Sequence, residues 1–444
     1  MKTQKLEIKA FEKKLSSAAA KNRVAGIRKF CFQVFIILSH WFGRLCEWAV
    51  AFVLFIILSL PVLLFCVVRK IINGKEIFSR KTIYGLNGKI ATIRFFNFFH
   101  IIPSYIFLFF HVLTLDIRLI GVSIKELGKD MRTVGDTSLY IEKPGIFNLW
   151  FLRNSSRIGH EGKMQVELEY TFKRGFIGDA MLLLRSLPAV FFHTSSKETF
   201  EQISIMGVTF QNLTMKKAVE MLRQGIAEKK QGKVYFVNPD CFNKTVHNKA
   251  YFKTLCRADY ILPDGIGVLL ACKFKKTPLK ENVNGTDMLP YVCKMAVKNK
   301  YSIYLLGARA GVASAMAGRL KRTYSGVNIC GTHHGFISDE KERNSVIKDI
   351  NAVAPDILLV AMGTPAQEIW IDRFAPELKA GVIIGVGGLF DFYSGNTPRA
   401  PRWMREIGLE WLYRLLQEPR RMFFRYIIGN PLFLWRAWRS RRSE

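Results

Sequence analysis

Short apolar runs alternate with amphipathic patterns from about residue 201 onward. Between the runs, segments such as Thr214–Ala227 and Gly311–Tyr324 place apolar residues three and four positions apart, which predicts helices that pack by one face. Strands that alternate with helices favour a parallel α/β sheet of the Rossmann-like type. The predicted buried strands are residues 233–237, 260–262, 301–306, 327–331, 357–362 and 382–386.

A different pattern lies nearer the N-terminus. No charged residue occurs between Trp48 and Val68, and a helix of that length can cross a hydrocarbon core about 30 Å thick. Both flanks are basic, since residues 1–44 carry ten Lys or Arg against two Glu and residues 69–94 carry seven against one. Because basic flanks are retained in the cytoplasm, a span with one flank outside is disfavoured.

Pro61 interrupts this uncharged run. A proline frees a carbonyl and bends the helix axis, so we favour a re-entrant helical hairpin that breaks near Pro61 and returns to the cytoplasmic face. A kinked, spanning helix is the alternative. A second uncharged run, residues 95–115, contains an asparagine, two histidines and a proline. We predict that it lies at the membrane interface, and a second true span is its alternative.

Charge limits the partners. The chain has 66 Lys and Arg against 35 Asp and Glu, a net charge of +31, which requires an anionic partner or surface. Residues 399–444 contain eleven Arg, no Lys and nine aromatic residues, a composition that fits nucleic acid and anionic lipid equally. The uncharged run favours lipid, so we predict no nucleic acid partner. Eight scattered cysteines without C-x-x-C spacing exclude a disulfide framework and a cysteine zinc site.

Polar residues and glycines follow the predicted strands. Ligands of such sheets bind beyond the carboxyl ends of the strands, and there the chain has Asn238-Pro239-Asp240, Asp264-Gly265, residues 307–311, residues 362–368 and residues 385–391. The glycines at 307 and 311 precede a helix start that could receive a diphosphate. These segments predict one polar site at this edge.

The same segments belong to longer ordered motifs, namely Pro263-Asp264-Gly265, Asn284-Gly285-Thr286-Asp287, Gly331–Gly335, Met362–Glu368, Gly385–Asp391, Arg399–Met404 and Gly408–Arg421. Through them, residues 202–444 resemble the WecG/TagA/CpsF glycosyltransferase family. The resemblance implies transfer of N-acetylmannosamine, its uronic acid or a related sugar from a UDP donor to an undecaprenyl-diphosphate-linked sugar, with inversion.

The resemblance also implies roles for residues. Inversion by single displacement needs a base for the proton of the acceptor hydroxyl, and the family's base falls on Asp264; capping of the next helix is the alternative role. Gln367 matches the family's donor-contacting glutamine. The other donor candidates are Asn238, Gly307, Arg309, Gly387 and Gly388, and the candidates for the acceptor and its diphosphate are Asn284, Asp287, Arg414, Arg420 and Arg421.

We expect no cofactor and no obligatory metal ion, because the domain contains no D-x-D motif. His333 and His334 are predicted to shape the pocket, since no third ligand is spaced nearby. Two positions depart from the family's pattern, with Phe236 where Thr is usual and Asn282 where Arg is frequent. If that arginine neutralises the donor phosphates, another cation such as Arg309 must do so here.

The region before the sheet carries a looser resemblance. Its motifs are Ile77–Arg80, Gly85–Lys89, Leu115–Gly121 and Lys143–Trp150, and they resemble the bacterial sugar transferase family, the monotopic phosphoglycosyl transferases. That family uses an Asp-Glu pair at the positions held here by Ser104 and Tyr105. Neither residue supplies an anionic nucleophile, so we predict a degenerate membrane-docking domain of the α+β class. An unrelated membrane anchor is the alternative.

These interpretations predict an enzyme of four parts: a basic segment (1–44), a sugar-transferase-like membrane domain (45–198), the glycosyltransferase domain (199–398) and a basic helical appendage (399–444). We expect it on the cytoplasmic face of a bacterial inner membrane, with a UDP-sugar, a polyprenyl-diphosphate-linked acceptor and anionic lipid as partners. A bifunctional or initiating phosphoglycosyl transferase and a non-catalytic membrane scaffold are the alternatives. Whether the chain forms a homo-oligomer stays open.

Overall fold

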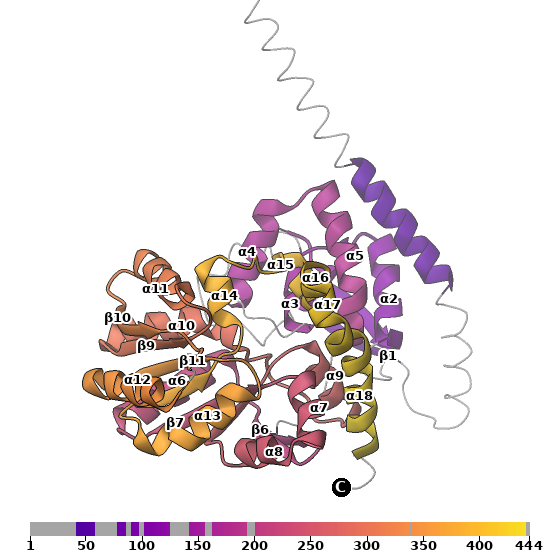
Figure 1. Ribbon diagram of the computed structural model, residues 1–444. Helices are drawn as coiled ribbons and strands as arrows, with labels where there is room; N and C mark the ends of the chain where they lie inside the picture. Colours follow the sequence, from indigo (N-terminus) through magenta and orange to yellow (C-terminus); the bar gives the residue numbers. More distant parts are fainter. Residues whose placement is uncertain are drawn as a thin grey trace, which may run out of the picture. The chain divides into compact units, whose positions relative to one another are not determined.

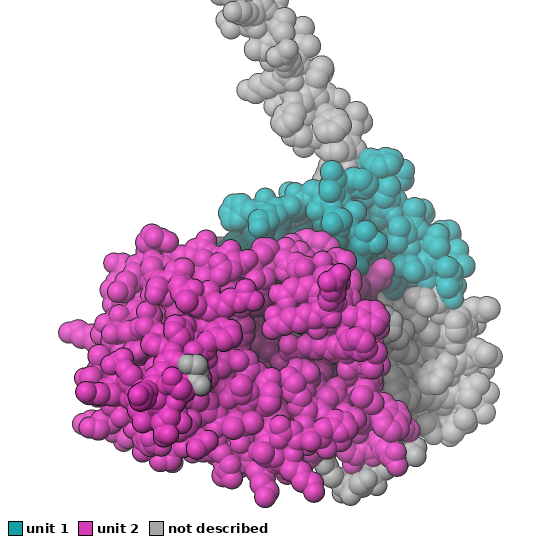
Figure 2. All heavy atoms as spheres, in the orientation of Figure 1, with its two compact units in different colours: residues 1–151, 162–186 teal, residues 152–161, 187–444 magenta. Residues whose placement is uncertain are grey.

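The computed structural model describes residues 41–57, 78–85, 90–96, 102–124, 142–155, 162–192, 200–337 and 339–440. The chain forms two compact units, residues 1–151 with 162–186 and residues 152–161 with 187–444 (Figure 2). The predicted break near Pro61, nearly all of the basic segment 1–44 and the loop 69–77 lie outside the described residues.

The described part of the first unit contains helices and two small sheets. β1 (Phe78–Tyr84) pairs antiparallel with β2 (Ile90–Phe96), and β3 (Arg118–Ile120) pairs parallel with β4 (Gly145–Phe147). A Cβ atom at Gly145 would lie 2.1 Å from the nitrogen of Gly121, so this close approach requires glycine. The described helices that begin before residue 192 are residues 41–57, α2 (Ile102–Leu113), α3 (Leu149–Ser155), α4 (Lys163–Lys173) and α5 (Phe176–Phe192).

Large apolar side chains are exposed on residues 41–57 and on α5. Ile177 and Leu184 of α5 are 77% and 62% exposed, and Trp41 and Leu45 are 69% and 65% exposed. An apolar face of this extent marks an interaction surface. Among the described residues, no helix is both long enough and apolar enough to span a membrane.

The second unit is built on a six-stranded sheet in the order β10-β9-β11-β12-β7-β8, and every neighbouring pair is parallel. Figure 1 labels β7, β9, β10 and β11 of this sheet. The prediction of a parallel α/β fold is therefore confirmed, and each predicted strand corresponds to an observed one. The strands are β7 (Gly232–Val237), β8 (Tyr260–Pro263), β9 (Ser302–Gly307), β10 (Asn328–His333), β11 (Ile357–Ala361) and β12 (Val382–Gly385).

Both faces of this sheet are buried. On β7, Tyr235 and Val237 join one apolar core while Val234 and Phe236 join the other, because successive side chains of a strand point to opposite faces. The helices between the strands are α6 (Met215–Ala227), α7 (Pro239–His247), α8 (Lys249–Cys256), α9 (Ile266–Phe274), α10 (Gly285–Asn299), α11 (Val312–Thr323), α12 (Glu340–Val353), α13 (Ala366–Phe374) and η3 (Ala375–Glu377). A hairpin of β5 (Gln202–Ile205) and β6 (Val208–Gln211) precedes them.

The segment after β12 is helical, as predicted for the appendage. It begins with α14 (Leu389–Ser394) and continues with α15 (Arg402–Glu406), α16 (Glu410–Gln417), α17 (Pro419–Phe423), the π-helical turn η4 (Phe424–Ile428) and α18 (Gly429–Ser440). Phe433 of α18 is fully buried and stacks on Phe242 of α7 with 5.1 Å between ring centroids. The appendage is therefore part of the second unit's packed structure.

Candidate functional site

A cleft opens at the carboxyl ends of β7, β8 and β12. It consists of two adjoining cavities of about 160 and 640 Å³, and the helices of the appendage supply part of both linings. The two cavities share Asn238, Asp240, Asp264, Thr286, Phe392, Arg414 and Arg425.

Asp264 follows β8 directly and faces this cleft. Its backbone nitrogen donates to the carbonyl oxygen of Val237 at 2.9 Å, which continues the pairing of β8 with β7. Gly265 then takes φ +94° and precedes α9, a conformation that favours glycine. The nitrogen of Gly265 donates to Oδ1 of Asn282 at 2.7 Å. The Pro-Asp-Gly turn is thereby fixed on both sides of the carboxylate.

The surroundings of Asp264 raise the pKa of its carboxyl group to about 6. Burial is the largest cause and the Glu410 carboxylate adds to it, while Arg425, Arg414 and a hydrogen bond from Asn238 act in the opposite direction. A carboxylate with a pKa near 6 is a better proton acceptor at neutral pH than an ordinary aspartate and is still mostly ionised.

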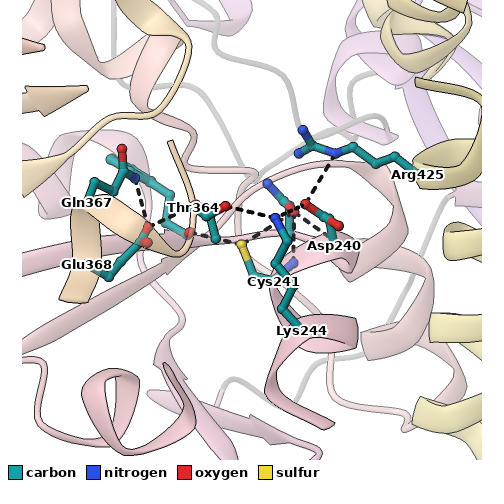
Figure 3. Close-up of polar contacts among 9 residues, drawn as sticks. Asp240, Cys241, Lys244, Thr364, Gln367, Glu368 and Arg425 are labelled. Carbon is teal, nitrogen blue, oxygen red and sulfur yellow. Dashed lines mark hydrogen bonds and ion pairs between the residues drawn. The ribbon is translucent and has the colours of Figure 1, made fainter. Parts of the chain in front are cut away.

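Asn238 and α7 form one wall of the cleft. Oδ1 of Asn238 accepts from the nitrogens of Asp240 and Cys241 at 3.1 and 3.2 Å, so Asn238 is the N-cap of α7 with Pro239 in the first turn. Four residues after Asp240, Lys244 donates from Nζ to an Asp240 carboxylate oxygen and to the carbonyl of Thr364, each at 2.8 Å. The Asp240 carboxylate also lies 3.6 Å from Nε of Arg425 (Figure 3).

Gln367 lies at the start of α13, and both ends of its side-chain amide are engaged. Oε1 accepts from the nitrogen of Gly387 at 2.9 Å, and Nε2 donates to Oε1 of Glu368 at 2.7 Å (Figure 3). Glu368 is fully buried and also accepts from the Thr364 hydroxyl at 3.0 Å. Burial raises the pKa of Glu368. The amide of Gln367 thus holds the Gly387 turn against α13, and Gly387 and Gly388 both line the larger cavity.

Asn284 and Asp287 join the first turn of α10 to the appendage. Asn284 caps α10 by accepting from the nitrogen of Asp287, and its Nδ2 donates to the Asp287 carboxylate, both at 2.8 Å. Nη1 of Arg399 donates to the same carboxylate at 2.6 Å, and Arg405 lies 3.4 Å away. Burial opposes the charge of Asp287 and is the largest single influence, but Arg399, Asn284 and Arg405 together outweigh it and hold the pKa of that carboxyl below its usual range.

Arginines from the appendage line the cleft. Arg414 of α16 borders both cavities and stacks over the Phe392 ring at 5.2 Å, and Arg421 borders the larger one. Within the described parts of the chain, no carboxylate lies within ion-pair distance of Arg414. Its charge is therefore available to an anionic ligand, whereas Arg425 is shared with Asp240.

Comparison of the sequence with known proteins identifies its family. The Glycosyl transferase WecG/TagA/CpsF family matches residues 203–444. The chain belongs to this family. Proteins of Staphylococcus aureus strains MW2 and NCTC 8325 are each 32% identical to it over 244 residues, which is 54% of this chain and 94% of each relative. Both are named N-acetylglucosaminyldiphosphoundecaprenol N-acetyl-beta-D-mannosaminyltransferase. Like its family, the chain is a glycosyltransferase.

The family match begins at residue 203 and does not extend to the region before it. The resemblance of that region to bacterial sugar transferases therefore stays a prediction. Ser104 lies in helix α2, which overlaps the run predicted to be interfacial.

Most of the site residues predicted through the family resemblance border the cleft, but three of them do not. Neither Gly307 nor Arg309 lines either cavity. A Cβ atom at Gly335 would lie 2.9 Å from Cα of Gly307, and the Gly335 nitrogen donates to the Ala308 carbonyl at 2.8 Å, so the loop after β10 packs on this turn. Arg420 is exposed outside both cavities. His333 and His334 are also absent from the cleft linings, contrary to expectation.

The two departures from the family's pattern have structural roles. Asn282 holds the turn after Asp264 through the Gly265 nitrogen, which a longer arginine would not reproduce. The Phe236 ring lies so close to Gly285 that a Cβ atom there would be 3.1 Å from it. Phe236 therefore packs beneath the start of α10.

Several cleft residues were not among the predicted site residues: Lys244, Arg425, Tyr426 and Arg436, together with Asp240, Glu410 and Trp411, which the predicted segments contained without a role. Asp240 and Lys244 are spaced i, i+4 directly after a strand-end cap, a signal of one charged helix face. Arg425, Tyr426 and Arg436 lie beyond the last of the predicted motifs, and only the docking of the appendage brings them to the sheet.

Proposed function

We propose that the chain transfers an N-acetylhexosamine-type sugar, such as N-acetylmannosamine or its uronic acid, from a UDP-sugar to an undecaprenyl-diphosphate-linked sugar, with inversion. The single observation that carries the proposal is Asp264, a carboxylate with a pKa of about 6 that shares one cleft with Arg414 and Arg425. The names of the Staphylococcus aureus relatives support the acceptor and the sugar class.

Asp264 acts as the general base. It takes the proton of the acceptor hydroxyl as that oxygen attacks the anomeric carbon, and the bond between that carbon and the UDP oxygen breaks on the opposite side. A single displacement of this kind inverts the anomeric centre. Asn238 orients the carboxylate through its hydrogen bond, and Asn282 holds the turn that carries it.

Cations stabilise the leaving UDP. Charge builds on the diphosphate as the glycosidic bond breaks, and fixed guanidinium groups lower the energy of that state in a partly dry cleft. Because Arg309 lies outside the cleft linings, we assign this role to Arg414 together with Arg425. Gly387 and Gly388 offer backbone close to the donor, and Gln367 holds their turn.

The acceptor enters from the side of the appendage. Arg421 borders the larger cavity and binds the diphosphate of the lipid-linked acceptor. Asp287 and Asn284 position rather than contact the acceptor, because their side chains are committed to each other and to Arg399. The ion pair of Asp287 with Arg399 anchors the start of the appendage over the cleft.

The donor and acceptor are tested by one assay on the purified full chain. UDP release is measured with UDP-N-acetylmannosamine and either undecaprenyl phosphate or undecaprenyl diphosphate N-acetylglucosamine. We expect UDP release with the second acceptor alone. Release of UMP with the first would establish the phosphoglycosyl transferase alternative, and release of neither nucleotide with any UDP-N-acetylhexosamine would establish the scaffold alternative.

We also propose that the protein is held on the cytoplasmic face of a bacterial inner membrane. The exposed apolar face of residues 41–57 and α5 and the exposed aromatic residues of the appendage, among them Phe424 and Trp435, support this location. Basic residues beside them suit anionic lipid.

Flotation with anionic phospholipid vesicles tests this location. Ile177→Glu combined with Leu184→Glu places two charges on the apolar face of α5, so we expect the bound fraction to fall several-fold. Val353→Glu combined with Ser325→Glu adds the same charge at exposed positions of the sheet unit and serves as the matched control. Equal flotation of the two double variants would remove α5 from the membrane-binding surface.

A further inference from the structure

Three side chains with metal-binding atoms lie together far along the sheet from Asp264. His333 ends β10, the strand at the opposite edge from β8, and His334 follows it. Glu342 lies in the first turn of α12. One ligand atom from each of the three lies within 4.8 Å of the other two. None of these residues lines the cleft.

The ring of His333 is oriented by its own backbone. Its Nδ1 lies 2.8 Å from the carbonyl oxygen of His334, and because a carbonyl only accepts, Nδ1 carries the hydrogen. Nε2 of the neutral ring is then left with its lone pair. Metal-binding histidines commonly have this arrangement, in which one ring nitrogen donates to a carbonyl and the other binds the ion.

His334 faces Glu342 without a hydrogen bond. Its Nε2 lies 3.6 Å from Oε1 of Glu342, which exceeds hydrogen-bonding distance. Its Nδ1 is buried and has no hydrogen-bond partner among the described residues. A half-buried imidazole without hydrogen bonds and beside a carboxylate has the geometry of a ligand pair that an ion can complete.

We propose that His333, His334 and Glu342 bind one divalent ion of the zinc class. Two imidazoles and a carboxylate suit Zn²⁺, Co²⁺ or Ni²⁺ rather than Mg²⁺ or Ca²⁺, which prefer oxygen ligands alone. Two bonds of about 2.1 Å to one ion span at most about 4.2 Å, so ligand atoms up to 4.8 Å apart approach by less than an ångström on binding. Solvent completes the coordination.

The ion links the end of β10 to α12. The loop between them packs on the turn after β9, where the Gly335 nitrogen donates to the Ala308 carbonyl, so the ion stabilises the outer edge of the sheet. Arg343 adjoins Glu342 in sequence, but its guanidinium pairs with Glu340 and lies over the Phe374 ring. Its charge is therefore engaged away from the proposed ion site. This role is independent of the reaction in the cleft.

The test uses the full chain, freed of metal by dialysis against a chelator. Zn²⁺ affinity and stoichiometry are measured by competition with a chromophoric chelator, and Co²⁺ serves as a visible-absorption probe of the coordination. We expect one Zn²⁺ per chain and a rise in Tm on adding it. Glu342→Gln and His334→Gln should each weaken binding at least about tenfold. Glu340→Gln changes an exposed carboxylate in the same helical turn and should bind as the unaltered chain does.

Other results would overturn the proposal. Failure of the unaltered chain to bind Zn²⁺ would show an ion pair of His334 with Glu342 and nothing more. Zn²⁺ binding that Glu342→Gln leaves intact would place the ion elsewhere, and its loss on alkylation of the thiols would assign it to cysteines such as the exposed Cys256. Because Glu342 is only partly buried in a helix that Asp339 caps, this variant is expected to fold.

Discussion

Asp264→Asn is expected to lower kcat/KM for sugar transfer by about 10²- to 10⁴-fold, the range for loss of a general base. Asparagine has nearly the same shape and keeps a polar atom toward Asn238, so the turn should persist while its proton acceptor is lost. The measurement is UDP release with the lipid-linked acceptor, together with UDP binding by calorimetry. We expect UDP binding to be retained or to tighten, since the variant removes a negative charge that interacts with Arg414 and Arg425.

The pH dependence provides a second, independent readout. Burial raises the pKa of Asp264 to about 6, and a base works only when deprotonated. The profile of kcat/KM should therefore rise with pH along a limb centred near pH 6 and level off above it. An aspartate at its ordinary pKa would place that limb near pH 4, and Asp264→Asn should abolish it.

Asp349→Asn is the matched control for these measurements. Asp349 is exposed on α12 and borders neither cavity, so this variant changes the same net charge outside the site. It should keep the full rate and the limb near pH 6. Retention of the full rate by Asp264→Asn itself would rule out Asp264 as the base; it does not cap α9 either, because Gly265 is the N-cap and no side chain among the described residues accepts from the first turn.

The sheet could be predicted from local sequence because each of its strands is a short apolar run that both faces bury. Val234 to Val237 and Ile303 to Leu306 are almost wholly buried. Because both faces of these strands are apolar, polar and apolar residues do not alternate along them, and each strand appears in the sequence as a continuous apolar segment. The C-terminal edge of such a sheet is also where ligands bind. These two facts led to the segments that hold Asp264, Gln367 and Gly387 without any knowledge of the strand order, and the family resemblance then supplied the roles of these residues.

Which strand-end turns border the cleft depends on the strand order, and the sequence does not reveal that order. Gly307 follows a strand and precedes a helix as a phosphate-binding turn would, yet β9 lies between β10 and β11 and the backbone at Gly335 packs against that turn. Likewise Glu342 reaches His333 only because the chain turns back from β10 into α12. Such contacts depend on loop paths and on the docking of α16 to α18, and no short-range pattern encodes them.

Arg414→Gln should have the second large effect, a fall in kcat/KM of about 10²- to 10³-fold, as expected when one fixed donor to a developing oxyanion is removed. Arg414 borders both cavities, stacks on Phe392 and has no carboxylate partner among the described residues, so its charge is not already neutralised. The inhibition constant of UDP should rise with the loss of rate, because the same guanidinium binds the product diphosphate. Arg414→Lys keeps the charge but not the paired N–H donors, so its kcat/KM should lie between that of the unaltered chain and that of Arg414→Gln.

Arg439→Gln is the appropriate control, since Arg439 also belongs to the appendage and stacks on an aromatic ring, that of Trp435 at 5.5 Å, but borders neither cavity. It should leave the rate and the inhibition by UDP unchanged. If Arg414→Gln raised only the KM of the lipid acceptor and left inhibition by UDP unchanged, Arg414 would bind the acceptor diphosphate instead. Arg425 would then be the cation that stabilises the leaving UDP. Because Arg425 is partly neutralised by Asp240, Asp240→Asn should tighten UDP binding in either arrangement, so the inhibition constant of UDP for Arg414→Gln is the measurement that distinguishes them.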